Sequence, residues 1–312
     1  MIGLAQVYVL AGLTFTAFAL LSARDASNPR RFANTGFWGL LAVSMFAGDR
    51  LGDFGNGLLV LALVAIAGLR GLGKGTGGSA AEERAANAER HGNRLFLLAL
   101  VIPATALAGT FLFKQFPALV DAKQVTLVSL ALGVVLALVA GAIWLRPAPA
   151  LPLQEGRRLM DAVGWAGILP QMLASLGAVF ALAGVGDVVG ALMADVIPAG
   201  SLLGAVIAYG LGMALFTMVM GNAFAAFPVM AAAIGLPLLI HQYQGDPAIV
   251  SAIGMLAGFC GTLMTPMAAN FNIVPAALLE LDDRNAVVKA QIGTALPLLI
   301  VNIALIYWLA FP

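Results

Sequence analysis

Two polar segments, each interrupted by glycine and proline, lie within the most apolar part of this chain. Residues 159–281 contain no lysine and no arginine. Inside this tract, Gly221-Asn222 marks the first polar segment, and residues 261–272 form the second. Amide and hydroxyl groups are costly in hydrocarbon unless they have partners or face a cavity. These two segments are therefore the first candidates for a binding site.

The residue types in both segments suit an ion or a small polar solute. Backbone carbonyls freed by a helix break, together with Thr and Asn oxygens, can coordinate a cation, and the N-terminus of a half-helix attracts a carboxylate. The alternative is that small and polar residues here pack helices together. We predict a substrate or ion site formed by Gly221, Asn222, Thr262, Thr265, Pro266, Asn270 and Asn272.

Two acids flank a short apolar piece at residues 188–196 and are candidates for ion coupling. Asp187 precedes this piece and Asp195 lies near its end. An acid near a membrane site can carry a proton or help to hold Na⁺. The Gly-Val-Gly-Asp sequence before the piece is also typical of a turn, so the alternative is that both acids mark an aqueous boundary.

Sequence motifs of known catalytic and metal sites are missing. The chain has no H-E-x-x-H, no G-x-S-x-G and no Cys/His cluster. We therefore expect no enzyme, no catalytic residue, no bound metal and no cofactor beyond a coupling Na⁺ or H⁺. Residues 73–78 match G-x-G-x-x-G, but the pattern follows a membrane span and not a strand, so we predict a flexible cytoplasmic linker. Cys260 is expected to be a small core residue, and His241 an outer-loop residue.

Composition places the chain among polytopic membrane proteins. Hydrophobic residues make up 61% and charged residues 10%, with a mean hydropathy of +0.98, whereas globular proteins have about 25% charged residues. The basic residues are spread over loops, so we expect no nucleic-acid partner. The N-terminus lacks a basic start and a cleavage site, and we expect Ile2–Ser22 to be a retained helix.

Apolar stretches of about 20 residues predict the membrane spans. The predicted spans are Ile2–Ser22, Phe32–Ala47, Gly55–Leu69, Leu95–Phe113, Val125–Leu145, Val163–Val185 and Ala286–Phe311. Residues 198–240 form either two full helices or a re-entrant hairpin, and residues 247–279 form a helix broken at residues 261–272. The expected fold is all-α, with roughly 8 full spans plus one hairpin, or roughly 10 spans.

The distribution of lysine and arginine orients these spans. Of the 16 basic residues, 13 lie in residues 23–31, 70–94, 146–158 and 280–289, and the alternate loops hold 3. Because cytoplasmic loops are enriched in basic residues, we predict an N-terminus outside the cell. We expect a multi-pass protein of the bacterial inner membrane.

The C-terminal part of the chain resembles a known superfamily of carriers. The sequence runs 164–170, 184–186, 221–223 and 265–270 are similar to the C-terminal half of ion transporter superfamily permeases, which include gluconate, citrate and dicarboxylate carriers. The resemblance covers about residues 93–311. It implies that Gly221-Asn222 is a hairpin tip and that residues 262–272 form the matching broken helix.

Residues 1–312 as a whole resemble a bacterial permease family, domain of unknown function 979. That family is typically encoded beside a second small membrane protein family, domain of unknown function 969, and often near enzymes that handle pyroglutamate (5-oxoproline). The resemblance implies a subunit of a secondary active transporter for a small organic anion, 5-oxoproline or a related carboxylate, coupled to H⁺ or Na⁺. The alternative is a non-transporting scaffold or regulatory subunit of a partner permease.

The predicted roles of the two parts of the chain rest on a feature that is missing from residues 1–145. Superfamily carriers have two repeats, each with a hairpin and a broken helix, but this segment shows no second amide-rich tip. We predict scaffold and docking helices plus the linker in residues 1–92, and a transport-type unit in residues 93–312. A second membrane protein of the 969 family is expected to supply the other half, and residues 1–69 are a candidate face for homo-oligomers.

Overall fold

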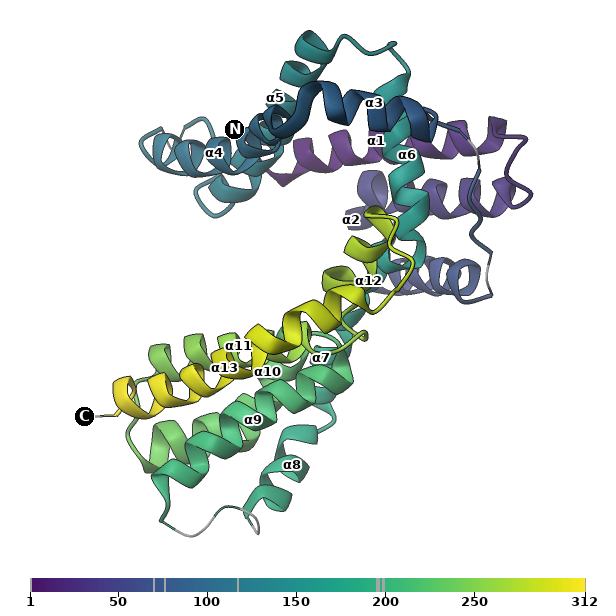
Figure 1. The fold of residues 1–312 in the computed structure, drawn as a ribbon. Coiled ribbons are helices and arrows are strands. Elements are labelled where there is room, and N and C mark those ends of the chain that lie inside the picture. Colours follow the sequence, from purple (N-terminus) through teal and green to yellow (C-terminus); the bar gives the residue numbers. More distant parts are fainter. Residues whose placement is uncertain are drawn as a thin grey trace. The chain divides into compact units, whose positions relative to one another are not determined.

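The computed structural model describes residues 2–69, 71–75, 77–116, 118–194, 197 and 200–311. The chain divides into two compact units, Met1–Gly164 and Trp165–Pro312. Each unit consists of packed helices, drawn in Figure 1. The predicted functional division at residues 92 and 93 stays a prediction, since it concerns roles and not compactness.

The first unit is built from apolar helices joined by polar loops. Its elements are α1 (Leu4–Arg24), α2 (Arg31–Gly68), α3 (Ala81–His91), η1 (Gly92–Arg94), α4 (Leu95–Lys114), α5 (Val125–Leu145) and α6 (Leu151–Val163). The main packed pairs are α1 with α2 and α4 with α5.

Helix α2 reverses its direction at Gly52. Gly52 has φ 63° and ψ 179°, a conformation that residues with a Cβ rarely adopt. The Asn56 Nδ2 donates to the Gly48 carbonyl at 2.8 Å, although residues eight apart in a straight helix lie about 12 Å apart along the axis. A Cβ added to Gly36 would lie 3.7 Å from Ile66 Cδ1. The two arms therefore pack together, as expected for separate spans at Phe32–Ala47 and Gly55–Leu69.

An aromatic cluster joins α1 to the first arm of α2. Trp38 is fully buried. Its ring stacks on Phe15 with centroids 5.9 Å apart, and meets Phe18 and Phe37 edge-on. Aromatic rings bury large areas and add directional contacts, so this cluster is the packing centre of the helix pair.

The second unit carries both predicted polar segments. Its elements are η2 (Gly164–Ile168), α7 (Leu169–Leu182), α8 (Val185–Ala194), α9 (Leu202–Met220), α10 (Ala223–Met230), the π-helix η3 (Ala231–Gln242), α11 (Pro247–Leu263), α12 (Ala269–Leu278) and α13 (Ala286–Leu309). Figure 1 shows α9, α11 and α13 side by side, and these three helices contact one another.

Small residues bring α9 and α11 close together. A Cβ on Gly254 would meet the Tyr209 ring, and one on Gly258 would lie 2.9 Å from Met213 Cε. The Gly254-x-x-x-Gly258 pattern thus serves helix packing, as small residues do in membrane bundles. Cys260 lies in the same core at 1% exposure and accepts a hydrogen bond from Asn302 Nδ2 at 3.4 Å.

Among the described residues, seven helices are long and apolar enough to cross a membrane, or eight if one bent pair counts as a span. This confirms a polytopic helical protein. Within the predicted span Val163–Val185, η2 and α7 cover residues 164–182, and the 67° bend into α8 falls at residues 183–184, close to the predicted end. Gly164 and Gly184 have φ values of +58° and +68°, which end the helices on either side.

Contacts within the first unit match the predicted alternation of loops. The Ile2 N–H donates to the Leu119 carbonyl at 2.7 Å, so the N-terminus lies beside the α4–α5 loop. At another place, the Asn28 side chain donates to the Gly73 carbonyl at 3.0 Å and so joins the loops at residues 23–31 and 70–94. In each pair, the distribution of basic residues predicts that the two contacting segments lie on the same side of the membrane.

Cysteine labelling tests which side faces the cytoplasm. In a Cys260→Ala background, Ala122→Cys is expected to react with an impermeant reagent added to intact cells, because loop 114–124 is predicted to be external. Ala85→Cys, on the exposed face of α3, is expected to react only after the cells are opened. Labelling of residue 85 from outside would contradict the orientation.

Candidate functional site

The first polar segment is the turn of a helical hairpin. Helix α9 ends at Gly221, whose φ of +76° is favoured in glycine and closes the helix. Asn222 then caps α10, and its Oδ1 accepts from the Phe224 N–H at 2.7 Å. The arms have 19 and 20 residues, so each is long enough by itself to cross a membrane.

The second polar segment is a break between α11 and α12. Helix α11 ends at Leu263, and α12 starts at Ala269 after Thr265-Pro266. Asn272 Nδ2 donates to the carbonyls of Thr262 and Thr265 at 2.8 and 2.7 Å. The Thr262 carbonyl belongs to the last turn of α11 and the Thr265 carbonyl to the break itself, so the Asn272 amide bridges the helix end and the break.

The hairpin tip packs directly against the helix break. A Cβ on Gly221 would lie 2.7 Å from the Met267 carbonyl carbon and would clash with its oxygen. The Thr265 hydroxyl donates to the Met218 carbonyl at 2.9 Å, and its oxygen accepts from the Met267 N–H at 3.2 Å. The structure therefore brings together the two segments that the sequence singled out.

Four helix ends surround this contact. They are the C-termini of α9 and α11, which present carbonyls, and the N-termini of α10 and α12, which present N–H groups. Each helix end carries a partial charge of about half an elementary unit. The region offers both signs of partial charge without a lysine or an arginine.

Several buried oxygens near the contact have no hydrogen-bond partner. They are Thr217 Oγ1, Asn270 Oδ1 and Asn272 Oδ1. Thr217 and Asn272 are fully buried. Burying such atoms unpaired is costly, and carbonyl and hydroxyl oxygens are ligands that alkali and other hard cations accept.

Thr217 was not among the predicted site residues. It lies one turn before Gly221, whose N–H donates to the Thr217 carbonyl at 2.7 Å. A Cβ on Gly258 would lie 3.3 Å from its hydroxyl oxygen. Thr217 is a polar residue one turn before the glycine that ends an apolar helix. This pattern could have identified it as a candidate from the sequence.

The other predicted residues have distinct places. The Thr262 hydroxyl donates to the Phe259 carbonyl at 2.7 Å, and Pro266 is exposed. Asp187 is exposed in the first turn of α8. The adjacent Gly186 packs against Val229, near the end of α10, and against Ala232, in η3. Asp195 lies outside the described residues.

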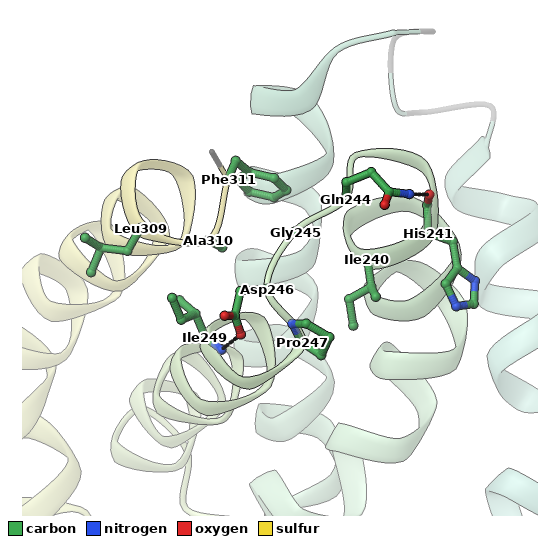
Figure 2. A pocket seen from close by; sticks show the side chains of 10 residues that line it. All are labelled: Ile240, His241, Gln244, Gly245, Asp246, Pro247, Ile249, Leu309, Ala310 and Phe311. Carbon is green, nitrogen blue, oxygen red and sulfur yellow. Dashed lines mark hydrogen bonds between the residues drawn. The ribbon is translucent and has the colours of Figure 1, made fainter.

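A pocket of about 630 Å³ lies at the opposite end of the hairpin arms, where η3 leads into α11 and α13 ends (Figure 2). The Asp246 carboxylate accepts from the N–H groups of Ala248 and Ile249 at 2.7 and 3.1 Å, and Gln244 donates to the His241 carbonyl. These groups are occupied in capping α11 and closing the loop. The tip and break remain the better candidate site.

Removal of the Asn272 cap is expected to destabilise the second unit. In Asn272→Ala, the Thr262 and Thr265 carbonyls lose their donor, at a cost of about 1–3 kcal/mol for each buried group left unpaired. Thermal unfolding of the purified protein is expected to show a clearly lower Tm. Asn285→Ala, at an exposed position before α13, is the control and should leave Tm unchanged. Equal Tm values for both variants would contradict the capping role.

Comparison with protein families gives one match over almost the whole chain. The family model described as protein of unknown function (DUF979) matches residues 5–311. Neither a curated protein nor a solved structure matches the chain. With the match extending from α1 to the last residues after α13, the chain belongs to the DUF979 family.

Proposed function

We propose that this chain is a membrane subunit of a secondary active transporter for a small organic anion. One observation carries the proposal: two breaks in apolar helices meet at Gly221 and Met267, close to buried oxygens that lack partners. Broken backbone at membrane depth is tolerated where protein or a water-filled site surrounds it, and transporters build their sites from discontinuous helices. The inner membrane of bacteria is the proposed location.

The charges of the region favour a carboxylate substrate and Na⁺ as its coupling ion. The N-termini of α10 and α12 carry positive partial charge, which attracts a carboxylate. The unpartnered oxygens of Thr217, Asn270 and Asn272 are neutral acceptors, which suit a cation. Coupling to H⁺ requires a titratable group, and Asp187 is the candidate for that alternative. From the resemblance, 5-oxoproline or a related carboxylate is the proposed substrate.

Uptake measurements test this function. Cells lacking their own 5-oxoproline uptake would express the chain together with the proposed partner of the 969 family. Labelled 5-oxoproline is expected to accumulate in Na⁺ medium and not in choline medium, and a protonophore should have little direct effect. Accumulation that needs a proton gradient and not Na⁺ would shift the coupling to H⁺.

A second candidate is a scaffold subunit of a partner permease. It differs in one outcome: uptake by the pair would then survive changes at Asn270 and Thr217 but not deletion of the chain. If neither 5-oxoproline nor other small carboxylates accumulate under any of these conditions, the transporter proposal fails.

A further inference from the structure

The glycine-rich residues 71–79, here called the strap, lie against polar side chains of the first unit. Within it, Thr76 lies outside the described residues. A Cβ on Gly73 would lie 2.5 Å from Asn28 Oδ1, one on Gly75 would clash with Asp25 Oδ2, and one on Gly77 would clash with Arg157 Nη2. In an extended segment, alternate residues share one face. The strap therefore has a glycine face pressed onto the loop after α1 and onto α6.

Hydrogen bonds fix both ends of the strap. The Gly73 carbonyl accepts from Asn28 and from Asn34 Nδ2 at 3.0 and 2.8 Å, and the Gly73 N–H donates to Asn34 Oδ1 at 2.9 Å. At the far end, the N–H and the hydroxyl of Ser79 donate to Glu155 Oε1 at 2.5 and 2.7 Å. The flexible linker expected for this region is wrong for the described part of residues 71–79.

Arg157 lies under the strap and links α6 to the rest of the unit. Its Nη2 is 2.8 Å from Asp25 Oδ2 and its Nη1 is 3.6 Å from Asp161 Oδ2, with a side chain 5% exposed. Asp161 Oδ1 in turn accepts from Asn34 Nδ2 and Trp38 Nε1, each at 2.9 Å. One buried guanidinium thus joins the end of α1, the first arm of α2 and α6.

The electrostatics of the cluster depend on this guanidinium. Burial raises the pKa of the Asp25 carboxyl, but hydrogen bonds from Ser27 and Arg157 and the charge of Arg157 outweigh it and lower the pKa overall. Burial dominates at Asp161 and raises its pKa despite donors from Trp38 and Asn34. Removing one partner from a buried ion pair leaves an uncompensated charge, which is strongly destabilising.

We propose that the strap and Arg157 form a latch that holds the loop at residues 23–31, the strap and helix α6 together as one rigid end of the first unit. Arg157 is its positioning residue, and the glycine face of the strap is what allows closure. The latch holds α6 to α1 and α2 up to Val163, immediately before the unit ends at Gly164. This inference concerns the first unit alone and does not depend on transport.

Limited proteolysis measures whether the latch is closed. The side chain of Lys74 is exposed within the strap, whereas Arg90 lies on the exposed helix α3. Cleavage in a folded segment requires local opening, so its rate reports the open population. Purified protein in detergent micelles is treated with trypsin, and cleavage after Lys74 is compared with cleavage after Arg90. The ratio does not depend on membrane orientation.

Arg157→Gln is expected to raise this ratio by about tenfold or more, since it leaves Asp25 and Asp161 without their cation. Arg157→Lys keeps the charge but loses the forked geometry, and should give an intermediate ratio. Rapid cleavage after Lys74 in the wild-type chain, or equal ratios for wild type and Arg157→Gln, would overturn the proposal.

A glycine variant tests the strap without changing any charge. Gly75→Ala places a methyl group against Asp25 and is expected to raise the same ratio. Gly57→Ala is the matched control, because a Cβ at Gly57 meets nothing within 4 Å, and it should behave as wild type. If Arg157→Gln does not yield folded protein, the Gly75→Ala and Gly57→Ala pair decides: equal ratios reject the latch.

Discussion

Asn270→Ala and Thr217→Val are expected to abolish uptake by the assembled transporter without lowering the unfolding temperature of the chain. Both oxygens are buried and have no hydrogen-bond partner in the protein. Removing them breaks no internal bond of those atoms, but takes away ligands for a bound cation. Loss of one such contact costs about 1–3 kcal/mol, or roughly tenfold or more in affinity.

Two control variants are needed to interpret the uptake result. One keeps the Thr217 hydroxyl, and the other makes the same change at a different threonine. Thr217→Ser retains the hydroxyl and should retain most uptake. Thr110→Val makes the same change in α4, where the hydroxyl donates to the Ala106 carbonyl at 2.6 Å, and should also retain uptake. Normal uptake in both Asn270→Ala and Thr217→Val would show that these residues only pack helices.

These variants differ from Asn272→Ala in a way that the sequence did not reveal. Three nearby positions, Asn222, Asn270 and Asn272, were equivalent candidates by composition. In the structure, Asn222 caps α10 and Asn272 caps the end of α11, whereas Asn270 Oδ1 has no partner. An amide's role depends on which carbonyls the chain brings within reach, and that is a property of the folded break.

Other features were predictable because local chemistry decides them. Gly221 with Asn222 predicted a chain reversal, since glycine favours φ above zero and asparagine caps helices. Pro266 predicted the break, since proline cannot donate within a helix. A common site for the two segments was predicted from their residue types, but the direct contact of Gly221 with Met267 was not, because these residues are far apart in the sequence.

The strap is the opposite case. Its glycine pattern was visible in the sequence, but we predicted a flexible linker and not a packed segment. Glycines at residues 73, 75 and 77 have the two-residue period of an extended segment with a bare face. Their partners are Asp25 and Asn28 in the loop after α1, and Arg157 in α6. Composition alone favours a flexible linker for such a stretch. Only the long-range contacts show that these residues form a packed strap instead of a flexible linker.

The second large effect is expected from reconstitution: the purified chain alone in liposomes should show no uptake, and the partner should restore it. In the described part of the second unit, the hairpin tip at Gly221 and the helix break at residues 264–268 already pack on each other. Sites of this kind in transporters form between repeats, with groups that converge from both. A lone unit would leave the partial charges of four helix ends facing an unmatched surface.

The decisive measurement is Na⁺-driven accumulation of labelled 5-oxoproline in liposomes that contain the chain, the proposed 969-family partner, or both. Only the pair is expected to accumulate substrate above the level of empty liposomes, and the pair carrying Thr217→Val should not. Copurification of the two proteins at a fixed ratio would support the same assembly. Full uptake by the chain alone would refute the need for a second half, because one tip and one break would then suffice for a complete site.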